Sequence, residues 1–456
     1  MNLQSLLNNL EKKFGLKPDG ARVLVVGLGE TGYSVAQFLL ETPIKFAVID
    51  SRKNPPLLES FRQQMPDVAL FCGSFTQAAF DVATHLIVSP GVSLQEPMLQ
   101  QATVSGIRIM SDIDLFACAT DKPIVAITGS NGKSTVTTMM GDLGKAAGVK
   151  TAIGGNLGTP ALNLLQQDAD LYVLELSSFQ LERTTALNAA AATVLNVTPD
   201  HLDRHDGMAA YAEEKQRVYR GDGAVILNID DEWVAGMAVP DRRTYSFSIE
   251  KSADFYLNNQ QDAALMFESQ VLMRVSELPL EGSHNVANAL AALALGHAVG
   301  LDLKLMCDAL KVFKGLPHRM QKVAQSKGVS WVNDSKATNI GAAVAALQGY
   351  QHKVILIAGG DAKGADMAEL APVVKEKCKA VVVMGKDAEL IRQAVESYVP
   401  VFSAANMREA VALAAQQANA GETVLLSPAC ASLDQYKSYA DRGNKFTEAV
   451  MEVLAC

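Results

Sequence analysis

Residues Ile124–Thr135 read I-V-A-I-T-G-S-N-G-K-S-T, and this stretch decides how the fold is interpreted. Its first five residues are apolar or β-branched, which is typical of a buried strand. Gly129 and Gly132 allow tight backbone angles, so that successive N–H groups can point at one anion. Lys133 adds a positive charge, and Ser134 offers a hydroxyl that suits Mg²⁺. The stretch therefore predicts a strand, a phosphate-binding loop and the start of a helix.

The loop departs from the strict phosphate-loop spacing, because Ile127 stands where the first glycine would be. A lone glycine turn after a strand is usually only a turn. The longer run T-G-S-N-G-K-S-T is far more specific, and we interpret it as a binding site for a nucleoside triphosphate. The residues expected to bind it are Gly129, Asn131, Gly132, Lys133, Ser134 and Thr135.

Composition narrows the class of protein. A chain of 456 residues should hold about three domains, and 49% hydrophobic residues can fill several cores. The net charge of −9 comes without a basic block, which argues against a nucleic-acid partner. No apolar run approaches the ~20 residues of a membrane span, and residues 1–20 lack a signal-peptide core. Six scattered cysteines without Cys-x-x-Cys spacing indicate a reducing cytoplasm.

The order of strands and helices predicts an α/β protein with three domains, at 1–111, 112–316 and 317–456. The first is Rossmann-like, the second carries the phosphate loop, and the third is again a Rossmann-like sheet. Strands are expected at 22–26, 45–49, 85–88, 107–110, 171–176, 192–197, 224–228, 354–357, 380–384 and 423–426. Helices are expected at 282–299, 367–377, 388–397 and 407–418.

The first domain contains Gly27, Gly29 and Gly32 directly after a strand, and Asp50 about twenty residues later. This spacing resembles a dinucleotide-binding unit. Two interpretations stay open. The glycines can simply allow helix–strand packing in a doubly wound domain, or they can bring backbone N–H groups to a nucleotide diphosphate.

Polar side chains follow strands of the central segment. Glu175 ends the strand L-Y-V-L-E, where a carboxylate can hold Mg²⁺, and a helix cap is the alternative. Behind Pro199 stand Asp200, His201, Asp203 and His205, and we expect His201 to be a ligand. Lys215 lies in A-E-E-K-Q-R-V-Y, where composition alone predicts a surface lysine.

Further polar groups follow along the chain. His284 and Asn288 share one helix face at i, i+4 spacing, either facing a ligand or capping the helix. Arg319 lies in the turn L-P-H-R-M-Q. After the next strand come Asp334, Ser335, Lys336, Thr338 and Asn339, and after the last strand comes S-P-A-C-A-S-L-D-Q-Y at 427–436.

Together these motifs resemble the Mur ligase family of the peptidoglycan pathway over nearly the whole chain. The runs T-G-S-N-G-K-S-T, L-E-L-S-S-F-Q-L, T-P-D-H-L-D-R-H, S-H-N-V-A-N-A-L, L-P-H-R and N-D-S-K-A-T-N stand in the family's order. The loop at 427–436 is similar to that of the member that adds D-glutamate. The Asp-Asn-Pro-Arg signature of the diamino-acid-adding member is missing from the sequence.

The resemblance implies a cytoplasmic, ATP-dependent ligase that adds D-glutamate to UDP-N-acetylmuramoyl-L-alanine through an acyl phosphate. It implies two Mg²⁺ sites and a carbamylated Lys215, and we expect a monomer. No protein nucleophile is needed, which agrees with the lack of a Cys–His or Ser–His constellation. The third domain would close on the central one, pivoting near Leu316–Pro317.

The resemblance also assigns roles to residues. Lys133, His201 and Lys215 would be catalytic, and the metal ligands would be Ser134, Glu175, His201 and the carbamate of Lys215. ATP would contact the loop together with Asn288, Arg319 and Asp334. The UDP-linked substrate would contact Thr31, Asp50, Ser51, Arg52, Ser89, Gly91, Asn156 and Ser177. D-Glutamate would lie near Lys336, Thr338, Lys363, Ser432, Leu433 and Tyr439.

The sequence departs from the family pattern at three positions. Glu30 replaces the apolar residue expected beside the uracil, and Tyr436 and Tyr439 replace phenylalanines. Three rival functions each explain only part of the sequence. An NAD-dependent oxidoreductase would leave the phosphate loop unexplained, and a folylpolyglutamate synthase normally lacks about a hundred of the residues before it. A non-catalytic scaffold would not need Lys133, Glu175 and His201.

Overall fold

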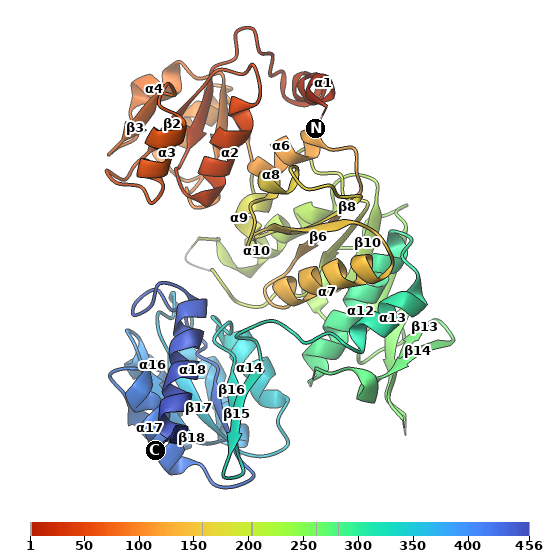
Figure 1. The fold of residues 1–456 in the computed structure, drawn as a ribbon, viewed down its shortest axis with the longest axis vertical. Helices are drawn as coiled ribbons and strands as arrows, with labels where there is room; N and C mark the ends of the chain where they lie inside the picture. The colour runs from red at the N-terminus through yellow and green to blue at the C-terminus, as the bar shows by residue number, and fades with distance from the viewer. Residues whose placement is uncertain (1, 157, 202–203, 261, 281, 456) are drawn as a thin grey trace. The chain divides into compact units, whose positions relative to one another are not determined.

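The structure is a computed structural model that describes residues 2–156, 158–201, 204–260, 262–280 and 282–455. The strands within these ranges form three sheets (Figure 1). The chain divides into two compact units. The first unit holds the five- and nine-stranded sheets and comprises Met1–Asn196, Tyr211–Met273 and Ala289–Leu310. The second holds the six-stranded sheet and comprises Val197–Ala210, Arg274–Asn288 and Lys311–Cys456.

The first sheet is parallel and has the strand order β3-β2-β1-β4-β5, which confirms the doubly wound prediction. Its strands are β1 (Val23–Val26), β2 (Phe46–Asp50), β3 (Leu70–Cys72), β4 (His85–Val88) and β5 (Arg108–Met110). Its segment of the chain carries helices α1 (Leu3–Phe14), α2 (Glu30–Leu40), α3 (Leu58–Gln64), α4 (Gln77–Asp81) and α5 (Pro97–Val104). β1 and β4 are buried along their whole length, as expected for strands covered on both faces.

Glycine is needed where α2 starts. A Cβ at Gly32 would lie 1.8 Å from the carbonyl oxygen of Gly27. Only a residue without a side chain lets the first turn of α2 approach the end of β1 this closely. The interpretation that the glycines allow helix–strand packing therefore holds at Gly32.

The central sheet has the strand order β14-β13-β12-β11-β10-β9-β6-β8-β7. Its strands are β6 (Ile124–Thr128), β7 (Thr151–Gly155), β8 (Leu171–Glu175), β9 (Ala191–Val194), β10 (Ala224–Asn228), β11 (Thr244–Ser248), β12 (Phe255–Asn258), β13 (Ala264–Phe267) and β14 (Gln270–Arg274). β12 pairs with β13 in antiparallel register. Sequence reasoning predicted β6, β8, β9 and β10 but missed β7 and the extension from β11 to β14.

The helices of the central segment follow the strands. They are α6 (Asp112–Ala119), α7 (Lys133–Ala146), α8 (Ala161–Leu164), α9 (Ser178–Leu181), α10 (Gly207–Gln216), η1 (Arg217–Tyr219), α11 (Glu232–Ala235), η2 (Val275–Glu277), α12 (Ser283–Ala298) and α13 (Leu303–Leu310). The helix predicted over 282–299 is thus confirmed as α12.

The third sheet has the strand order β15-β16-β20-β17-β18-β19, with only the β15–β16 pair antiparallel. Its strands are β15 (Gln321–Ser326), β16 (Val329–Asn333), β17 (Val354–Gly359), β18 (Cys378–Met384), β19 (Val401–Ser403) and β20 (Thr423–Leu426). Its helices are α14 (Ile340–Gln348), η3 (Met367–Leu370), α15 (Ala371–Lys377), α16 (Ala388–Val395), α17 (Met407–Gln417) and α18 (Tyr439–Ala455).

This segment differs from the prediction in its helices and in its edge strands. The helix expected over 367–377 is divided into η3 and α15, because Pro372 stands at the start of α15 and cannot donate a backbone hydrogen bond to the preceding turn. The helices α14 and α18 and the strands β15 and β19 were not predicted. Both faces of the sheet are nevertheless buried as a parallel sheet requires, with Leu356 in one apolar cluster and Ile355 and Ile357 in the other.

Among the described residues, every helix is too short or too polar to span a lipid bilayer. The three sheets agree with the expected three-part α/β organisation. The domain limits at 111/112 and 316/317 stay predictions.

Candidate active site

The phosphate loop joins β6 to α7 with the backbone geometry that the sequence predicts. Gly129 and Gly132 have φ angles of +146° and +86°, and a Cβ at Gly129 would lie 3.0 Å from Leu195 Cβ. Lys133 is the first residue of α7, and its Nζ donates to the carbonyls of Gly129 and Ser130 at 2.7 and 2.9 Å. An anion at the loop would therefore meet a lysine side chain and a helix N-terminus together.

Asn196 holds the phosphate loop in place, a role that sequence reasoning missed. The Ser130 N–H donates to the Asn196 carbonyl at 2.9 Å, and the Asn131 N–H donates to Asn196 Oδ1 at 2.7 Å. Asn196 Nδ2 returns a hydrogen bond to the Asn131 carbonyl at 3.1 Å. The strand predicted over 192–197 therefore ends early, at Val194, because the next residues pair with the loop. An amide side chain just after the strand that neighbours β6 was the available signal.

Two hydroxyl residues of the loop are buried in the first turn of α7. The exposed fractions of Ser134 and Thr135 are 3% and 1%. Thr135 Oγ1 makes no hydrogen bond to any described residue. A ligand that reaches this helix N-terminus would find hydroxyl groups already fixed by packing.

Glu175 ends β8 and stands beside Ile127 of β6 in the sheet register. Its Oε1 accepts a hydrogen bond from Asn156 Nδ2 at 2.7 Å, while its buried Oε2 accepts none from the described residues. A buried carboxylate oxygen without a donor is unfavourable, and a divalent cation would supply the missing partner. The helix-cap alternative is wrong, because the side chain of Ser177 caps α9.

No group of three or more His, Cys, Asp or Glu side chains gathers around one point in the described ranges. Mg²⁺ usually keeps several waters and takes its other ligands from one or two carboxylates and the substrate phosphates. Glu175 offers one such carboxylate, and the phosphate loop beside it would bring the substrate phosphates.

Lys215 is buried, which contradicts the surface lysine predicted from composition. Its exposed fraction is 1%, and its Nζ donates to the Gly129 carbonyl at 3.0 Å. The Nζ also lies 4.3 Å from the centroid of the Tyr211 ring. Tyr211 stands one turn earlier on α10 and accepts a hydrogen bond from Ser130 Oγ at 3.3 Å. One face of α10 thus places the Lys215 amine beside the phosphate loop.

Asp50, expected at the UDP-binding site, organises the end of the first sheet. Its carboxylate accepts hydrogen bonds from the Leu28 N–H at 2.7 Å and from Arg52 Nε and Nη2 at 2.9 and 2.7 Å. Burial opposes ionisation, but these hydrogen bonds outweigh it and hold the pKa of Asp50 below its ordinary value. The charged Asp50 therefore fixes the glycine-rich turn after β1.

The other residues expected to bind UDP lie at the same edge of the first sheet. Ser51 and Arg52 follow β2, Ser89 and Gly91 follow β4, and Thr31 lies in the first turn of α2. The carboxyl ends of parallel strands are where α/β sheets bind ligands. The sheet brings these residues to one edge, and their contacts with a substrate stay predictions.

In the second unit, Asp200 connects several residues with predicted roles. Its carboxylate accepts hydrogen bonds from Lys363 Nζ at 3.3 Å and Asn339 Nδ2 at 3.2 Å, and its Oδ2 is 3.6 Å from His201 Nε2. His201 has a left-handed backbone with φ of +55°. Asp203 lies outside the described residues. Asp200 therefore bonds the predicted D-glutamate lysine and lies beside the predicted metal ligand.

Asp334, expected to contact ATP, is buried in the same unit. Its carboxylate accepts hydrogen bonds from the Met320 N–H at 3.2 Å and Ser427 Oγ at 2.9 Å. Burial raises the pKa of Asp334 to about 6, although the nearby positive charge of Arg319 acts in the opposite direction. Asp334 thus links the turn before β15 to the loop after β20.

His284 and Asn288 start α12 in the second unit. Asn288 is buried, with an exposed fraction of 7%. Burial lowers the pKa of His284 to about 4, and the positive charge of Arg319 lowers it further. At neutral pH His284 is therefore an uncharged imidazole near the Arg319 side chain.

The Asp334 carboxyl predicts a measurable pH dependence. Its folded-state pKa of about 6 exceeds the ordinary value of 3.8, so the folded protein binds the proton more tightly. The contribution of Asp334 to stability therefore falls as the pH rises from about 4 to about 6. Asp334→Asn should increase the free energy of unfolding by up to about 3 kcal/mol at pH 7.5 and by much less at pH 4.

Chemical unfolding at the two pH values checks this expectation. Glu396→Gln, an exposed carboxylate at the end of α16, is the control and should show no such pH-dependent difference. A stability difference for Asp334→Asn that is the same at both pH values would contradict the assigned pKa.

Most of the residues expected to bind D-glutamate lie in loops of the third sheet, and Tyr439 is the first residue of α18. Lys336 Nζ is 4.0 Å from the centroid of the Tyr439 ring, and Thr338 follows in the same loop. Ser432 is buried, whereas Leu433 has an exposed fraction of 75%. The structure places these side chains on several segments of the third sheet, and their contact with D-glutamate stays a prediction.

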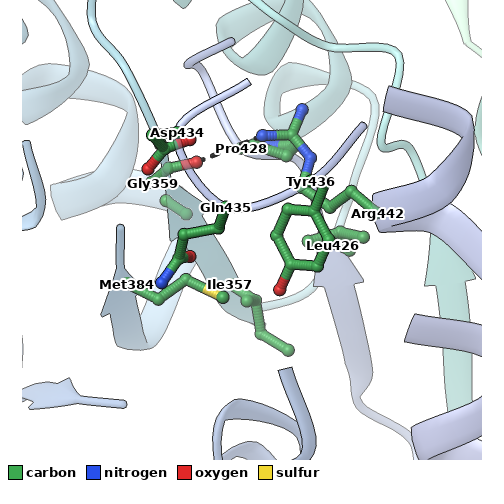
Figure 2. Close-up of a pocket in the computed structure, with 11 residues that line it drawn as sticks. Ile357, Gly359, Met384, Leu426, Pro428, Asp434, Gln435, Tyr436 and Arg442 are labelled. Carbon is green, nitrogen blue, oxygen red and sulfur yellow. Dashed lines mark hydrogen bonds between the residues drawn. The ribbon is translucent and has the colours of Figure 1, made fainter. Parts of the chain in front are cut away.

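Arg442 on α18 is a residue that sequence reasoning missed. It is 2% exposed and donates to Ser335 Oγ and the Ser335 carbonyl at 3.0 and 2.9 Å. It also donates to the carbonyls of Gly359 and Cys430 at 3.3 and 3.1 Å, beside the small pocket of Figure 2. Burial lowers the pKa of Arg442 to about 10, so it stays charged at neutral pH. It holds together the loops that carry Lys336 and Ser432.

Comparison with known domain families accounts for most of the chain. Residues 21–111 match the Mur ligase MurD-like N-terminal domain, residues 127–296 the Mur ligase middle domain, and residues 318–430 the Mur ligase glutamate ligase domain. These ranges follow the order of the three sheets along the chain.

Curated relatives cover nearly the full length. The UDP-N-acetylmuramoylalanine--D-glutamate ligase of Methylococcus capsulatus is 51% identical, with 94% of each chain covered. The enzyme of the same name from Pseudomonas aeruginosa is 50% identical, with 94% of this chain and 98% of the relative covered.

Solved structures share the fold at low sequence identity. A pseudomurein peptide ligase type C from Methanothermus fervidus is 19% identical with a TM-score of 0.63, and 95% of this chain and 100% of that chain are covered. UDP-N-acetylmuramate-alanine ligase MurC from Thermotoga maritima is 17% identical with a TM-score of 0.61, covering 95% and 99%. The three matched domains and the near-complete coverage at about half identity establish that the chain belongs to the Mur ligase family.

Proposed function

We propose that this chain joins D-glutamate to UDP-N-acetylmuramoyl-L-alanine, driven by ATP, in the cytoplasmic synthesis of peptidoglycan precursors. The observation that carries the proposal is the identity of 51% and 50% with ligases of that name over 94% of this chain. The phosphate loop between β6 and α7 supports it, because the reaction needs a site for ATP.

The reaction proceeds in two steps. The carboxylate of the UDP-linked substrate attacks the γ-phosphate, which gives an acyl phosphate and ADP. The amine of D-glutamate then attacks the acyl carbonyl, and phosphate leaves. The first step brings two anions together, so that the protein contributes mainly positive charge and positioning.

The residues at the phosphate loop suit that task. The Lys133 ammonium and the loop N–H groups hold the phosphates, and Asn196 fixes the loop before ATP arrives. Because no side chain forms a covalent intermediate, these groups act by binding the reacting phosphoryl group in place.

Mg²⁺, where bound, neutralises phosphate charge. Ser134 and Glu175 would hold one ion, and the unpartnered Glu175 Oε2 agrees with this role. His201 and carbamylated Lys215 would hold the second, an assignment that comes from the family resemblance.

The rival functions are less well supported. Residues 21–111 match a Mur ligase N-terminal domain, which leaves no reason to prefer a folylpolyglutamate synthase. An NAD-dependent oxidoreductase would make no use of the phosphate loop. Retention of Lys133, Glu175 and His201 argues against a non-catalytic scaffold.

The amino-acid specificity gives a direct test. With UDP-N-acetylmuramoyl-L-alanine and ATP, phosphate release should depend on D-glutamate. Its kcat/KM should exceed that of L-glutamate, L-alanine or meso-diaminopimelate by at least about 100-fold, because charged donors bind carboxylates with strict geometry. Lys336 and Lys363 are the lysines proposed for the two carboxylates of D-glutamate.

Omission of the UDP-linked substrate is the control for background ATP hydrolysis. A preference for L-alanine or the diamino acid would contradict the D-glutamate assignment while leaving the family intact. No release of phosphate with any amino acid would contradict the ligase function itself.

A further inference from the structure

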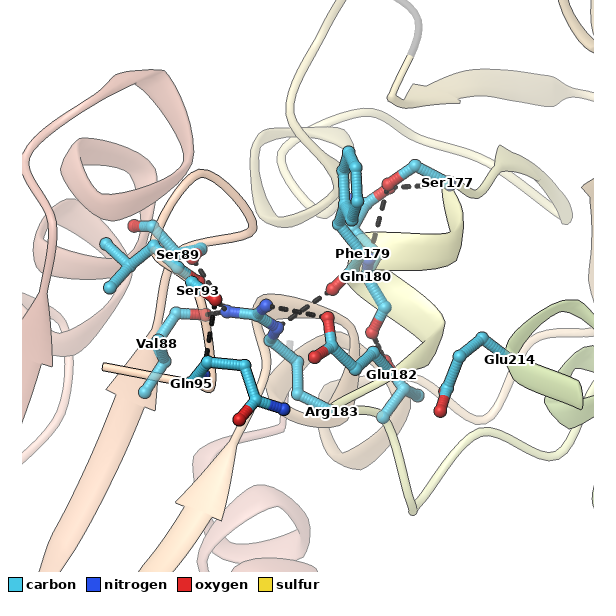
Figure 3. A network of polar contacts seen from close by, with 12 residues as sticks. Val88, Ser89, Ser93, Gln95, Ser177, Phe179, Gln180, Glu182, Arg183 and Glu214 are labelled. Carbon is cyan, nitrogen blue, oxygen red and sulfur yellow. Dashed lines mark hydrogen bonds and ion pairs between the residues drawn. The ribbon is translucent and has the colours of Figure 1, made fainter. Parts of the chain in front are cut away.

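Arg183 lies just after α9 and contacts a turn of the first sheet. Its side chain has an exposed fraction of 0%. Its Nη1 donates to the carbonyls of Val88, Ser89 and Val92 at 3.4, 2.8 and 3.1 Å, while its Nε donates to the Phe179 carbonyl at 2.8 Å (Figure 3). One guanidinium therefore joins the turn after β4 to the helix after β8.

The turn at 88–92 is held on its other side by the first sheet. The Ser89 N–H donates to the Val26 carbonyl at 2.9 Å, and Ser89 Oγ donates to the Gly27 carbonyl at 3.0 Å. The Val92 N–H donates back to the Ser89 carbonyl at 3.0 Å. The shape of the turn is therefore set by its hydrogen bonds to the end of β1 and by its own hydrogen bond between Val92 and Ser89. Arg183 connects this turn to α9.

The other end of α9 carries a predicted substrate residue. Ser177 caps the helix by accepting from the Gln180 N–H at 3.2 Å, and the Gln180 side chain accepts from the Ser177 N–H at 3.1 Å. Gln180 also donates to the carboxyl of Asp112, at the start of α6. The Ser177 end of this helix is therefore fixed within the central segment.

A buried arginine at this position has no simple packing explanation. A guanidinium removed from water is unfavourable unless its donors are satisfied, and an apolar side chain would remove the donor that the converging carbonyls share. The Glu182 carboxylate at 3.2 Å from Arg183 Nη2 supplies a nearby negative charge. These contacts make the connection between the turn and the helix directional and rigid.

We propose that Arg183 is a positioning residue that sets the UDP-binding turn at 88–92 relative to the muramoyl-binding start of α9. This inference rests on the proposed function, in which Ser89 and Gly91 contact the UDP part of the substrate and Ser177 contacts the muramoyl part. A ligand that spans both places gains affinity only if their separation is fixed before it binds. A ligand that occupies the turn alone does not need that separation.

Calorimetric binding of two ligands tests the inference. Arg183→Ala should weaken binding of UDP-N-acetylmuramoyl-L-alanine about tenfold, a typical energy of coupling between two sites. Binding of UDP alone should change by less than about twofold, since the turn keeps its bonds to β1. KM for the UDP-linked substrate should rise while kcat stays within about twofold, because the lost interaction serves binding and not the chemical step.

Arg183→Lys keeps the charge but lacks the planar fork that bonds the Phe179 carbonyl through Nε and the turn through Nη1, so it should lose an intermediate amount of affinity. It also covers the case in which Arg183→Ala fails to fold, which thermal unfolding would reveal. Arg220→Ala is the matched control. Arg220 is also an arginine that bonds a backbone carbonyl, since its Nη1 donates to the Thr184 carbonyl just after α9 at 2.8 Å. That variant should bind both ligands as the original chain does.

Equal losses for both ligands would overturn the inference, because they would mean that Arg183 only shapes the turn. Unchanged binding of both ligands in Arg183→Ala and Arg183→Lys would overturn it as well. If the original chain bound UDP-N-acetylmuramoyl-L-alanine no tighter than UDP, the proposed function would fail together with the inference. Binding of the two ligands by the original chain therefore distinguishes failure of the proposed function from failure of the inference about Arg183 alone.

Discussion

Lys133→Ala is expected to abolish measurable turnover, a loss of at least about 1,000-fold in kcat, which is the upper range for removing one preorganised charge-stabilising donor. The Lys133 Nζ lies within the phosphate loop, held by the Gly129 and Ser130 carbonyls. No other side chain of the loop carries a positive charge. The transferring phosphoryl group would therefore lose the loop's one lysine at the point where negative charge must be neutralised.

Phosphate release under saturating substrates measures this effect, and circular dichroism and thermal unfolding verify the fold. Lys145→Ala is the matched control, because Lys145 is exposed at the far end of the same helix α7. The control should keep full activity. Near-normal turnover of a correctly folded Lys133→Ala would contradict the proposed role of the loop and the mechanism with it.

The elements that sequence reasoning predicted well are those with local physical signals. The strand before the phosphate loop is a short apolar run that ends at a glycine, and the structure places β6 at the predicted residues. The same holds for β10 and β20, which are also short apolar runs followed by polar residues. Parallel strands buried on both faces give continuous apolar runs, so that they stand out even without a periodic pattern.

The strands that were missed have weaker signals. β11 reads T-Y-S-F-S and β14 reads Q-V-L-M-R, so each mixes polar and apolar residues within only five positions. Such short segments are ordered by pairing with neighbouring strands and not by their own composition. The extension of the central sheet from β11 to β14 therefore could not be read from one stretch of sequence.

The site residues also divide into those with a local sequence signal and those without one. Gly129, Gly132 and Lys133 form a contiguous motif, and their geometry follows from local backbone requirements. Asn196 and Arg183 act through contacts with residues more than sixty positions away in the sequence. A single sequence contains no information on which distant carbonyl an amide or guanidinium will meet, so these roles needed the structure.

Lys215 shows most clearly how tertiary contacts override composition. Its helix is rich in charged residues, and nothing in A-E-E-K-Q-R-V-Y marks one lysine as buried. The structure nevertheless encloses it between the Tyr211 ring and the Gly129 carbonyl. A buried ammonium is unfavourable unless its charge is compensated.

We propose that this amine reacts with CO₂ to give a carbamate and a released proton. The carbamate is an anionic oxygen ligand suited to Mg²⁺, whereas a free ammonium would repel the ion. Its remaining N–H can still donate to the Gly129 carbonyl. The proposal agrees with the position of Lys215 at the phosphate loop, although the spacing to the D-H-L-D run is one residue shorter than the family pattern.

Lys215→Ala is expected to lower kcat by about 100-fold, the upper range for losing a group that supports a metal ligand shell. Acetate or propionate should restore part of the activity by supplying a carboxylate in the vacated space, whereas ethylamine should not. If the plain amine were the working group, ethylamine would rescue instead. Glu213→Ala, an exposed position on the same helix, is the control and should keep its activity.

A second measurement separates the carbamate from any other role of a buried lysine. ¹³C-labelled bicarbonate should give a carbamate resonance in the original chain that is lost in Lys215→Ala. Absence of that resonance, together with a fully active Lys215→Ala, would overturn the proposal. A carbamate resonance without rescue by acetate or propionate would mean that the carbamate forms but is not the oxygen ligand. If the carbamate were the oxygen ligand, a short carboxylic acid in the same space would bind the ion in its place.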